Sequence, residues 1–264
     1  FVKPLGIVVL LVKLWLSVVY LSDSLYFCAN YNTVCSMIQE NFIKIYEKSF
    51  KKNWELPALT DYSKGTTFSF ADVAKEIARI HILFEECQIR RGDKIALIGK
   101  DSARWCIVYM AAVTYGAIIV PILQDFSPND VHHIINHSES VFLFVSDRIW
   151  DTLEEEMIED VRGVFSLSDF RCLHQRDGES IQKLLKGMDE KMAEKYPDGF
   201  GKDDIEYAEL DNDKVVLLNY TSGTTSYSKG VMIPYRALWS NTQFAFDVLK
   251  MNPGDKLVSI CLLY

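Results

Sequence analysis

The chain has 264 residues, of which 49% are hydrophobic, and it carries a formal net charge of −8. This length is sufficient for one large buried core or two small ones. No stripe of lysine and arginine is interleaved with aromatic residues, so the composition excludes nucleic acid as an expected partner. None of the six cysteines forms a C-x-x-C pair, and Cys87 and Cys106 fall within apolar helical patterns, which favours reduced thiols over zinc ligands or disulfides.

The first segment in chain order is the run Leu5–Leu21, which is apolar apart from one serine and Lys13. Its 17 residues are at the short limit for a bilayer span, and a central lysine costs about 2.5–3.5 kcal/mol on insertion scales. Three interpretations remain open: translated sequence upstream of Met37, a membrane anchor, or a cleaved signal peptide. We prefer the first and separate a hydrophobic extension, residues 1–36, from a domain at 37–264. The expected location is the cytoplasm, with attachment to a membrane surface if the run is an anchor.

Four segments have the periodicity or the end signals of helices. An amphipathic helix is predicted over residues 37–50. A longer helix starts after Ser69, whose hydroxyl can cap it together with Asp72. Its apolar face consists of residues at i, i+3 and i+4 spacing, namely Phe70, Val73, Ala74, Ile77, Ile80, Phe84 and Cys87. Ser127 followed by proline predicts a third helix start, and residues 236–249 form a fourth amphipathic pattern.

Four apolar strand candidates are spaced almost evenly between these helices. They begin near Lys94, Ala117, Val141 and Val164, so successive starts lie 23, 24 and 23 residues apart. A later strand is predicted at Lys256–Cys261. Strands that alternate with helices at this interval indicate βαβ units. The predicted fold class is therefore α/β, with a parallel sheet that has helices on both faces.

The most informative segment is the loop sequence Tyr-Thr-Ser-Gly-Thr-Thr-Ser-Tyr-Ser-Lys-Gly at residues 220–230. Apolar runs at 215–218 and 231–233 flank it, which predicts a strand, a loop of small residues and a second strand. Such a loop can direct backbone N–H groups and hydroxyls toward one point and so form an anion-binding nest. Lys229 adds a positive charge suited to a phosphate chain. The predicted ligand is a polyphosphate, most plausibly ATP.

Three other kinds of segment share features with this loop. A Walker A loop has its lysine after the second glycine and a helix directly beyond, whereas Lys229 precedes Gly230 and strand-like residues follow. Ser226 and Lys229 match the Ser-x-x-Lys signature of penicillin-binding enzymes, but that pair needs a helical turn that nothing here starts. The third interpretation is a flexible Ser/Thr/Gly surface turn.

Two further clusters suggest metal binding only weakly. His133 and His137 share a helix face next to His132, but no third ligand has suitable spacing, and a solvated helix face is the simpler interpretation. The acidic stretch 198–213 lacks the alternating ligands of an EF-hand, so it is predicted to be an exposed connector. No metal ligand is assigned in this chain.

The loop resembles the phosphate-binding loop of the adenylate-forming enzymes, the acyl-CoA synthetase superfamily, through Tyr-Thr-Ser-Gly-Thr-Thr followed by Lys-Gly-Val-Met. Residues 91–97 resemble the strand entry of that family, and 101–105 with 115–117 resemble its following helix and turn. The Arg-Trp pair that begins at Arg104 and the form of the loop that begins with Tyr220 are closest to long-chain fatty acid–CoA ligases. The resemblance implies that residues 37–264 are a partial AMP-binding (adenylation) domain, the incomplete first half of the large N-terminal domain of such an enzyme.

The resemblance also implies the residues that bind phosphate, which are Thr221, Ser222, Gly223, Thr224, Thr225, Lys229 and Gly230. The family pattern has glycine where Ser226 stands and proline where Ser228 stands. Serine resists a positive φ and crowds a close ligand approach, and losing the proline makes the backbone before Lys229 less preorganised. These departures favour weakened phosphate binding.

The implied reaction has two steps. A fatty carboxylate attacks the α-phosphate of ATP to give an acyl-adenylate and pyrophosphate, and coenzyme A then takes the acyl group and releases AMP. ATP, Mg²⁺ and coenzyme A are the implied cofactors or co-substrates. The family's adenine motif, ribose-binding acid and C-terminal catalytic lysine cannot be located, so no catalytic residue is assigned and the chain is expected to be inactive alone. The alternatives are a non-catalytic nucleotide-binding or membrane-anchored remnant and a ligase for a different carboxylate.

Overall fold

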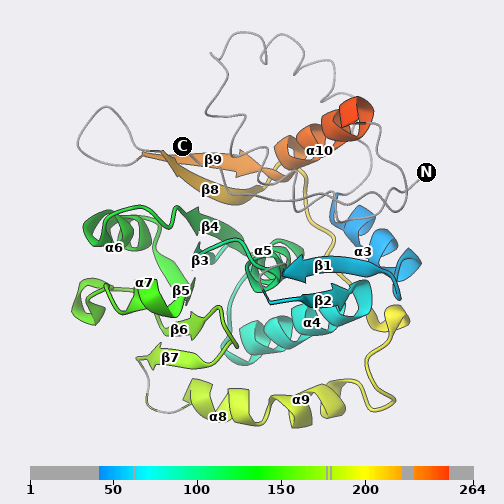
Figure 1. The fold of residues 1–264 in the computed structure, drawn as a ribbon, viewed down its shortest axis with the longest axis horizontal. Helices are drawn as coiled ribbons and strands as arrows, with labels where there is room; N and C mark the ends of the chain where they lie inside the picture. The colour runs from blue at the N-terminus through cyan, green and yellow to red at the C-terminus, as the bar shows by residue number, and fades with distance from the viewer. Residues whose placement is uncertain (1–41, 62–63, 177, 179, 222–228, 250–264) are drawn as a thin grey trace.

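The computed structural model describes residues 42–61, 64–176, 178, 180–221 and 229–249 (Figure 1). The apolar run Leu5–Leu21 and the predicted strand Lys256–Cys261 lie outside these ranges. Within them, no helix is both long and apolar enough to cross a bilayer.

The centre of the fold is a seven-stranded sheet of order β7-β6-β5-β3-β4-β8-β9. The five inner strands pair in parallel; they are β3 (Lys94–Ile98), β4 (Ile118–Ile122), β5 (Ser140–Val145), β6 (Gly163–Ser166) and β8 (Val215–Thr221). The four predicted strand starts are each confirmed to within one residue.

Both edges of the sheet depart from the parallel prediction. β7 (Cys172–Gln175) runs antiparallel to β6, and β9 (Lys229–Pro234) runs antiparallel to β8. Each edge strand follows its neighbour after a short connection, and a short connection can join only antiparallel strands. The sheet is therefore mostly parallel, with an antiparallel strand at each edge.

Helices cover both faces of the sheet, as predicted (Figure 1). On β3, Ile95 and Leu97 pack into the cluster that contains α4 (Phe70–Glu86) and α5 (Ala103–Tyr115). Ala96 and Ile98 pack into the opposite cluster, which contains α6 (Pro128–His137). Alternation along one strand therefore supplies both layers of the core, because successive side chains point to opposite faces.

The predicted helix ends agree closely with the structure. At the start of α4, the Ser69 hydroxyl accepts from the Asp72 amide at 3.1 Å, and the Asp72 carboxylate accepts from the Ser69 amide at 2.8 Å. Such a reciprocal capping box satisfies two amides that a helix leaves unpaired. α6 begins at the predicted proline, α10 (Tyr235–Leu249) begins one residue early, and α3 (Phe42–Lys52) occupies most of the first predicted helix.

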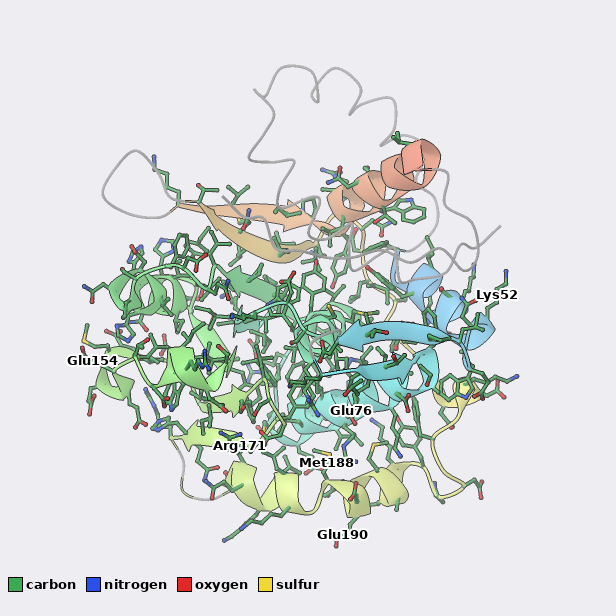
Figure 2. All side chains as sticks on the ribbon, viewed as in Figure 1. Lys52, Glu76, Glu154, Arg171, Met188 and Glu190 are labelled. Carbon is green, nitrogen blue, oxygen red and sulfur yellow. The ribbon has the colours of Figure 1, made fainter. Side chains whose placement is uncertain are left out.

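The remaining elements surround this framework. They are β1 (Pro57–Asp61), β2 (Thr66–Ser69), α7 (Asp147–Trp150), η1 (Glu155–Met157), α8 (Ser180–Lys186), α9 (Met188–Lys195) and η2 (Lys202–Asp204). β1 and β2 form a separate antiparallel hairpin. On α9, Met188 is buried in the core whereas Glu190 is exposed on the outer side (Figure 2). The predicted exposed connector 198–213 is only partly exposed, because Ile205 and Tyr207 are buried.

Candidate phosphate-binding site

The candidate phosphate loop lies between β8 and β9, and the two predicted strands that flank it are confirmed as an antiparallel pair. Thr221, the last residue of β8, faces Lys229, the first residue of β9, in the ladder. Residues 222–228 lie outside the described ranges, and these include the candidate residues Ser222, Gly223, Thr224 and Thr225. Because a strand follows Lys229, the helix that a Walker A loop requires is absent there.

The described ends of the loop lie at one edge of the sheet. β8 is parallel to β4, so Thr221 stands at the same edge as the carboxyl ends of the other inner strands. Thr221 is half-buried, whereas Lys229 and Gly230 are exposed. The ammonium group of Lys229 is thus accessible to an anion that approaches the loop. The structure brings Thr221, Lys229 and Gly230 together in adjacent register pairs.

Tyr220 precedes the loop and is buried, with 3% of its surface exposed. Its hydroxyl oxygen lies 2.7 Å from Nδ1 of His137, the last residue of α6. Burial raises the pKa of Tyr220, so the phenol keeps its proton and can donate to the imidazole. The sequence offered His137 as a metal ligand or, more simply, as part of a solvated helix face, and its contact with Tyr220 joins residues 83 positions apart. No local pattern could have indicated it.

The histidines of α6 do not form a metal site in the part of the chain that the structure describes. The rings of His133 and His137 lie on one face as predicted, with centroids 5.5 Å apart. His132 instead accepts a hydrogen bond at Nε2 from the Glu154 amide at 3.0 Å, and burial lowers its pKa. Across the described ranges, no three histidine, cysteine or acidic side chains gather as metal ligands would.

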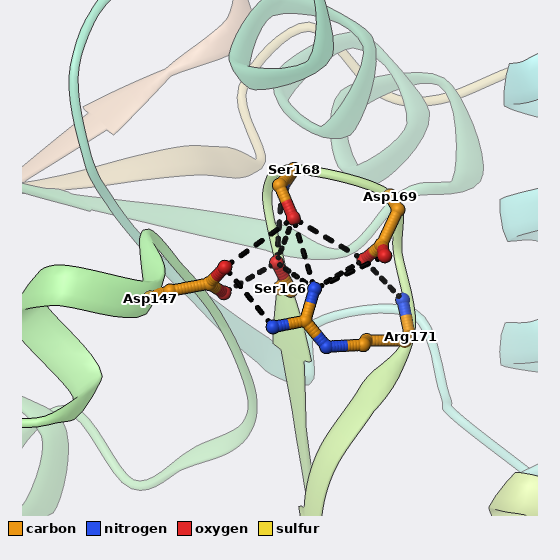
Figure 3. Close-up of polar contacts among 5 residues, drawn as sticks. All are labelled: Asp147, Ser166, Ser168, Asp169 and Arg171. Carbon is orange, nitrogen blue, oxygen red and sulfur yellow. Dashed lines mark hydrogen bonds and ion pairs between the residues drawn. The ribbon is translucent and has the colours of Figure 1, made fainter.

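A second polar cluster lies where β5 and β6 end, and Figure 3 shows its five residues. Arg171 contacts Asp169 at 2.9 Å and Asp147 at 3.0 Å. The buried Ser166 hydroxyl donates to Asp147 at 2.6 Å, and this bond is the main cause of the lowered pKa of that carboxyl group. Because two carboxylates neutralise the arginine, the cluster is not suited to binding an anion. It instead joins the β6–β7 turn to α7.

The three described cysteines are free, without a disulfide to one another. Cys106 is buried, and Cys87 and Cys172 are half-buried. Burial raises the pKa of the Cys87 thiol and raises that of Cys172 to about 11. These groups therefore stay protonated at neutral pH and are weak nucleophiles.

Comparison with known proteins identifies the family. Residues 46–264 match the AMP-binding enzyme family, and the chain belongs to that family. It is 26% identical over 221 residues to a crotonobetaine/carnitine–CoA ligase of Proteus mirabilis, covering 79% of this chain and 39% of the relative. It is 22% identical over 236 residues to a long-chain-fatty-acid–CoA ligase of Yersinia pestis, covering 84% and 42% respectively.

A solved structure supports the same fold. The fatty acyl-adenylate ligase from L. pneumophila, in complex with acyl adenylate and pyrophosphate, aligns with a TM-score of 0.60 at 14% identity. The alignment covers 80% of this chain and 33% of that protein. At this identity the likeness concerns the fold alone. The chain spans about two fifths of the length of the curated relatives. Its fold matches that of the N-terminal domain of adenylate-forming enzymes.

Proposed function

We propose that the protein containing this chain activates a carboxylate with ATP and then transfers the acyl group to coenzyme A. The observation that carries this proposal is the hydroxyl-rich loop at 222–228, which closes the β8–β9 hairpin with Lys229 opposite Thr221. Family membership supports the same activity. We place the adenylation domain within residues 37–264 and treat residues 1–36 as an extension.

In this proposal the loop binds the β- and γ-phosphates of ATP. Attack by the carboxylate on the α-phosphate builds negative charge on the phosphorus and on the departing pyrophosphate. Hydroxyl and amide donors of 221–225, together with the ammonium group of Lys229, would stabilise that charge, because donors directed at developing charge lower the barrier of the reaction. Gly230 is the last residue assigned to the phosphates, and its missing side chain leaves room for the Tyr220 ring beside the loop. These groups bind and orient, and none of them forms a covalent bond to the substrate.

Mg²⁺ and coenzyme A are assigned no protein ligands in this chain. In this proposal Mg²⁺ enters bound to the phosphate oxygens of ATP. Coenzyme A would act as the acyl acceptor in the second step. The chain spans less than half the length of the relatives named above, and we propose that these 264 residues bind MgATP.

For the substrate, we propose a long-chain fatty acid. The sequence at Arg104-Trp105 and the tyrosine at 220 resemble the long-chain ligases, and one relative carries that name. The matched proteins also include ligases named for crotonobetaine and carnitine. A protein that continues to the length of the family should therefore show ATP–pyrophosphate exchange that depends on palmitate and not on acetate, crotonobetaine or anthranilate. Exchange with one of the other acids would reassign the substrate, and no exchange with any acid would reject the ligase activity.

A second candidate function is nucleotide binding without catalysis, which Ser226 and Ser228 favour. In the family pattern, glycine at 226 permits a positive φ and a close ligand approach, and proline at 228 limits the backbone before Lys229. Restoring Ser226→Gly and Ser228→Pro together should tighten MgATP binding to this chain at least about two- to fivefold, since a compatible proline alone is worth about 0.4–1 kcal/mol. Isothermal titration of both forms measures the change. Equal affinities would show that the two serines do not weaken the site.

A further inference from the structure

The two ends of the β8–β9 hairpin are attached to the domain in different ways. The recorded register pair between β4 and β8 is Ile119 with Leu217. Beyond Leu217, the recorded register pairs of β8 are those with β9, and they continue to Thr221. On β9, Val231 and Met232 are exposed, at 45% and 70%. β8 also lies beside β4, so a side-chain contact near the loop would add to the support that the sheet gives this end of the hairpin.

The opposite end of the hairpin is fixed by Tyr235. Its hydroxyl donates to the carbonyl of Val113 in α5 at 2.9 Å, and its amide donates to the carbonyl of Lys214 at 3.0 Å. Tyr235 is buried in the cluster that contains α5. This contact holds the hairpin to one face of the sheet, at the end remote from the phosphate loop.

Tyr220 supplies the corresponding contact at the loop end, on the other face of the sheet. Its side chain belongs to the cluster that contains α6, and its ring meets that of His137 edge-on at 5.7 Å and 89°. Across the ladder, Tyr220 pairs with Gly230. A Cβ atom at Gly230 would lie 3.1 Å from Cζ of Tyr220, so the absence of a side chain at 230 lets the ring lie over β9.

These contacts lie one register pair from the loop. Tyr220 pairs with Gly230, and the next pair is Thr221 with Lys229. A shift of the Tyr220 ring would therefore move the backbone on both sides of the loop, including the residue that carries the ammonium group. His137 is itself exposed and covers the buried phenol hydroxyl.

We propose that His137 is a positioning residue for the phosphate loop, which it holds through its hydrogen bond to Tyr220, while Gly230 provides the space for the Tyr220 ring. The inference rests on the proposed function, because the position of the loop matters only if the loop binds a polyphosphate. His137 would contact no substrate atom. It would fix the two strands from which the loop leaves.

The test measures MgATP affinity and thermal stability of the 264-residue chain for Tyr220→Phe, His137→Leu and the double variant. Each single change should weaken binding by about three- to tenfold, the usual range for one net hydrogen bond. The double variant should be no weaker than either single variant, since both remove the same contact. His137→Asn, whose amide can replace Nδ1 as a hydrogen-bonding group, should restore most of the affinity.

Tyr235→Phe is the matched control, because it removes the phenol hydroxyl at the other end of the same hairpin. It should lower the melting temperature and leave MgATP affinity unchanged. If Tyr220→Phe lowers only the melting temperature in the same way, His137 has a structural role alone and the inference is wrong. If the unmodified chain binds no MgATP, the proposed function fails and the inference fails with it. Normal binding by the chain with unaltered binding by the variants overturns only the inference.

Discussion

Replacing Lys229 with alanine should lower the rate of ATP–pyrophosphate exchange by about 100-fold in a protein that continues to family length. Lys229 is the first residue of β9 and is exposed beside the loop, so its ammonium group can reach the phosphates. Removing one preorganised group that stabilises developing charge typically costs a factor of about 100 to 1,000. The exchange assay reports adenylate formation separately from the later transfer to coenzyme A.

Two other lysine variants make this result specific. Lys229→Arg keeps the positive charge and should retain much of the exchange activity, although arginine presents a planar fork instead of a point charge. Lys214→Ala removes an exposed lysine from the opposite end of the same hairpin and should leave exchange within about twofold, as expected for a surface change remote from the site. Unchanged exchange in Lys229→Ala would exclude this lysine from the reaction.

The inner strands could be predicted from the sequence because each is buried on both faces. A strand such as Phe142–Val145 has no exposed side to interrupt it with polar residues, so it forms a continuous apolar run. The start of α4 could be predicted because its capping box lies within four adjacent residues, from Ser69 to Asp72. Local signals of this kind do not depend on the rest of the fold.

The elements that were missed depend on distant contacts. β7 has four half-buried residues with mixed polarity, and its place is set by pairing with β6. The β1–β2 hairpin is rich in threonine and exposed positions, and Asp61 at its end accepts a hydrogen bond from the Ala103 amide at 2.8 Å, at the start of α5. A contact over 42 residues has no signature in a local pattern.

The candidate site shows the same division. The strands on either side of the loop could be predicted, because each is a run of consecutive apolar residues, at 215–218 and 231–233. The partner of Tyr220 could not, since the sequence places His137 on a helix face without indicating which strand that face meets. The topology β4-α6-β5, followed much later by β8 beside β4, is what brings the two residues together. The sequence therefore predicts the two strands that flank the loop but not the contact between Tyr220 and His137.

His81 should make the domain sensitive to mild acid. It lies in α4, where Nε2 is 3.0 Å from the carbonyl oxygen of Ala111 and 3.1 Å from Oγ1 of Thr114 in α5. Desolvation by burial, with a smaller contribution from the positive charge of Lys195, lowers the pKa of His81 from 6.5 to about 4. The imidazole is therefore neutral in the folded protein at pH values where it is charged in the unfolded chain.

The sign of the effect follows from these two pKa values. Between 6.5 and about 4, the unfolded chain binds a proton that the folded protein does not, so stability falls as the pH is lowered through this window. From about pH 7.5 to about pH 5, this group alone should reduce the free energy of unfolding by about 2 kcal/mol. In His81→Gln, whose amide can still donate to the Ala111 carbonyl, the loss over the same interval should be smaller by that amount. Urea unfolding at the two pH values measures it.

A second histidine, His174, serves as a control for the effect of removing an imidazole elsewhere in the domain. His174 has 31% of its side chain exposed and lies 3.0 Å from Glu155. His174 belongs to β7, outside the contact between α4 and α5, so His174→Gln is the matched control and should not flatten the dependence of stability on pH. If His81→Gln and the unmodified chain lose equal stability between the two pH values, then His81 is protonated in the folded domain and α4 and α5 tolerate its charge. If His81→Gln alone flattens the dependence, the neutral imidazole between α4 and α5 is the source of acid sensitivity in the layer that supports β3 and β4.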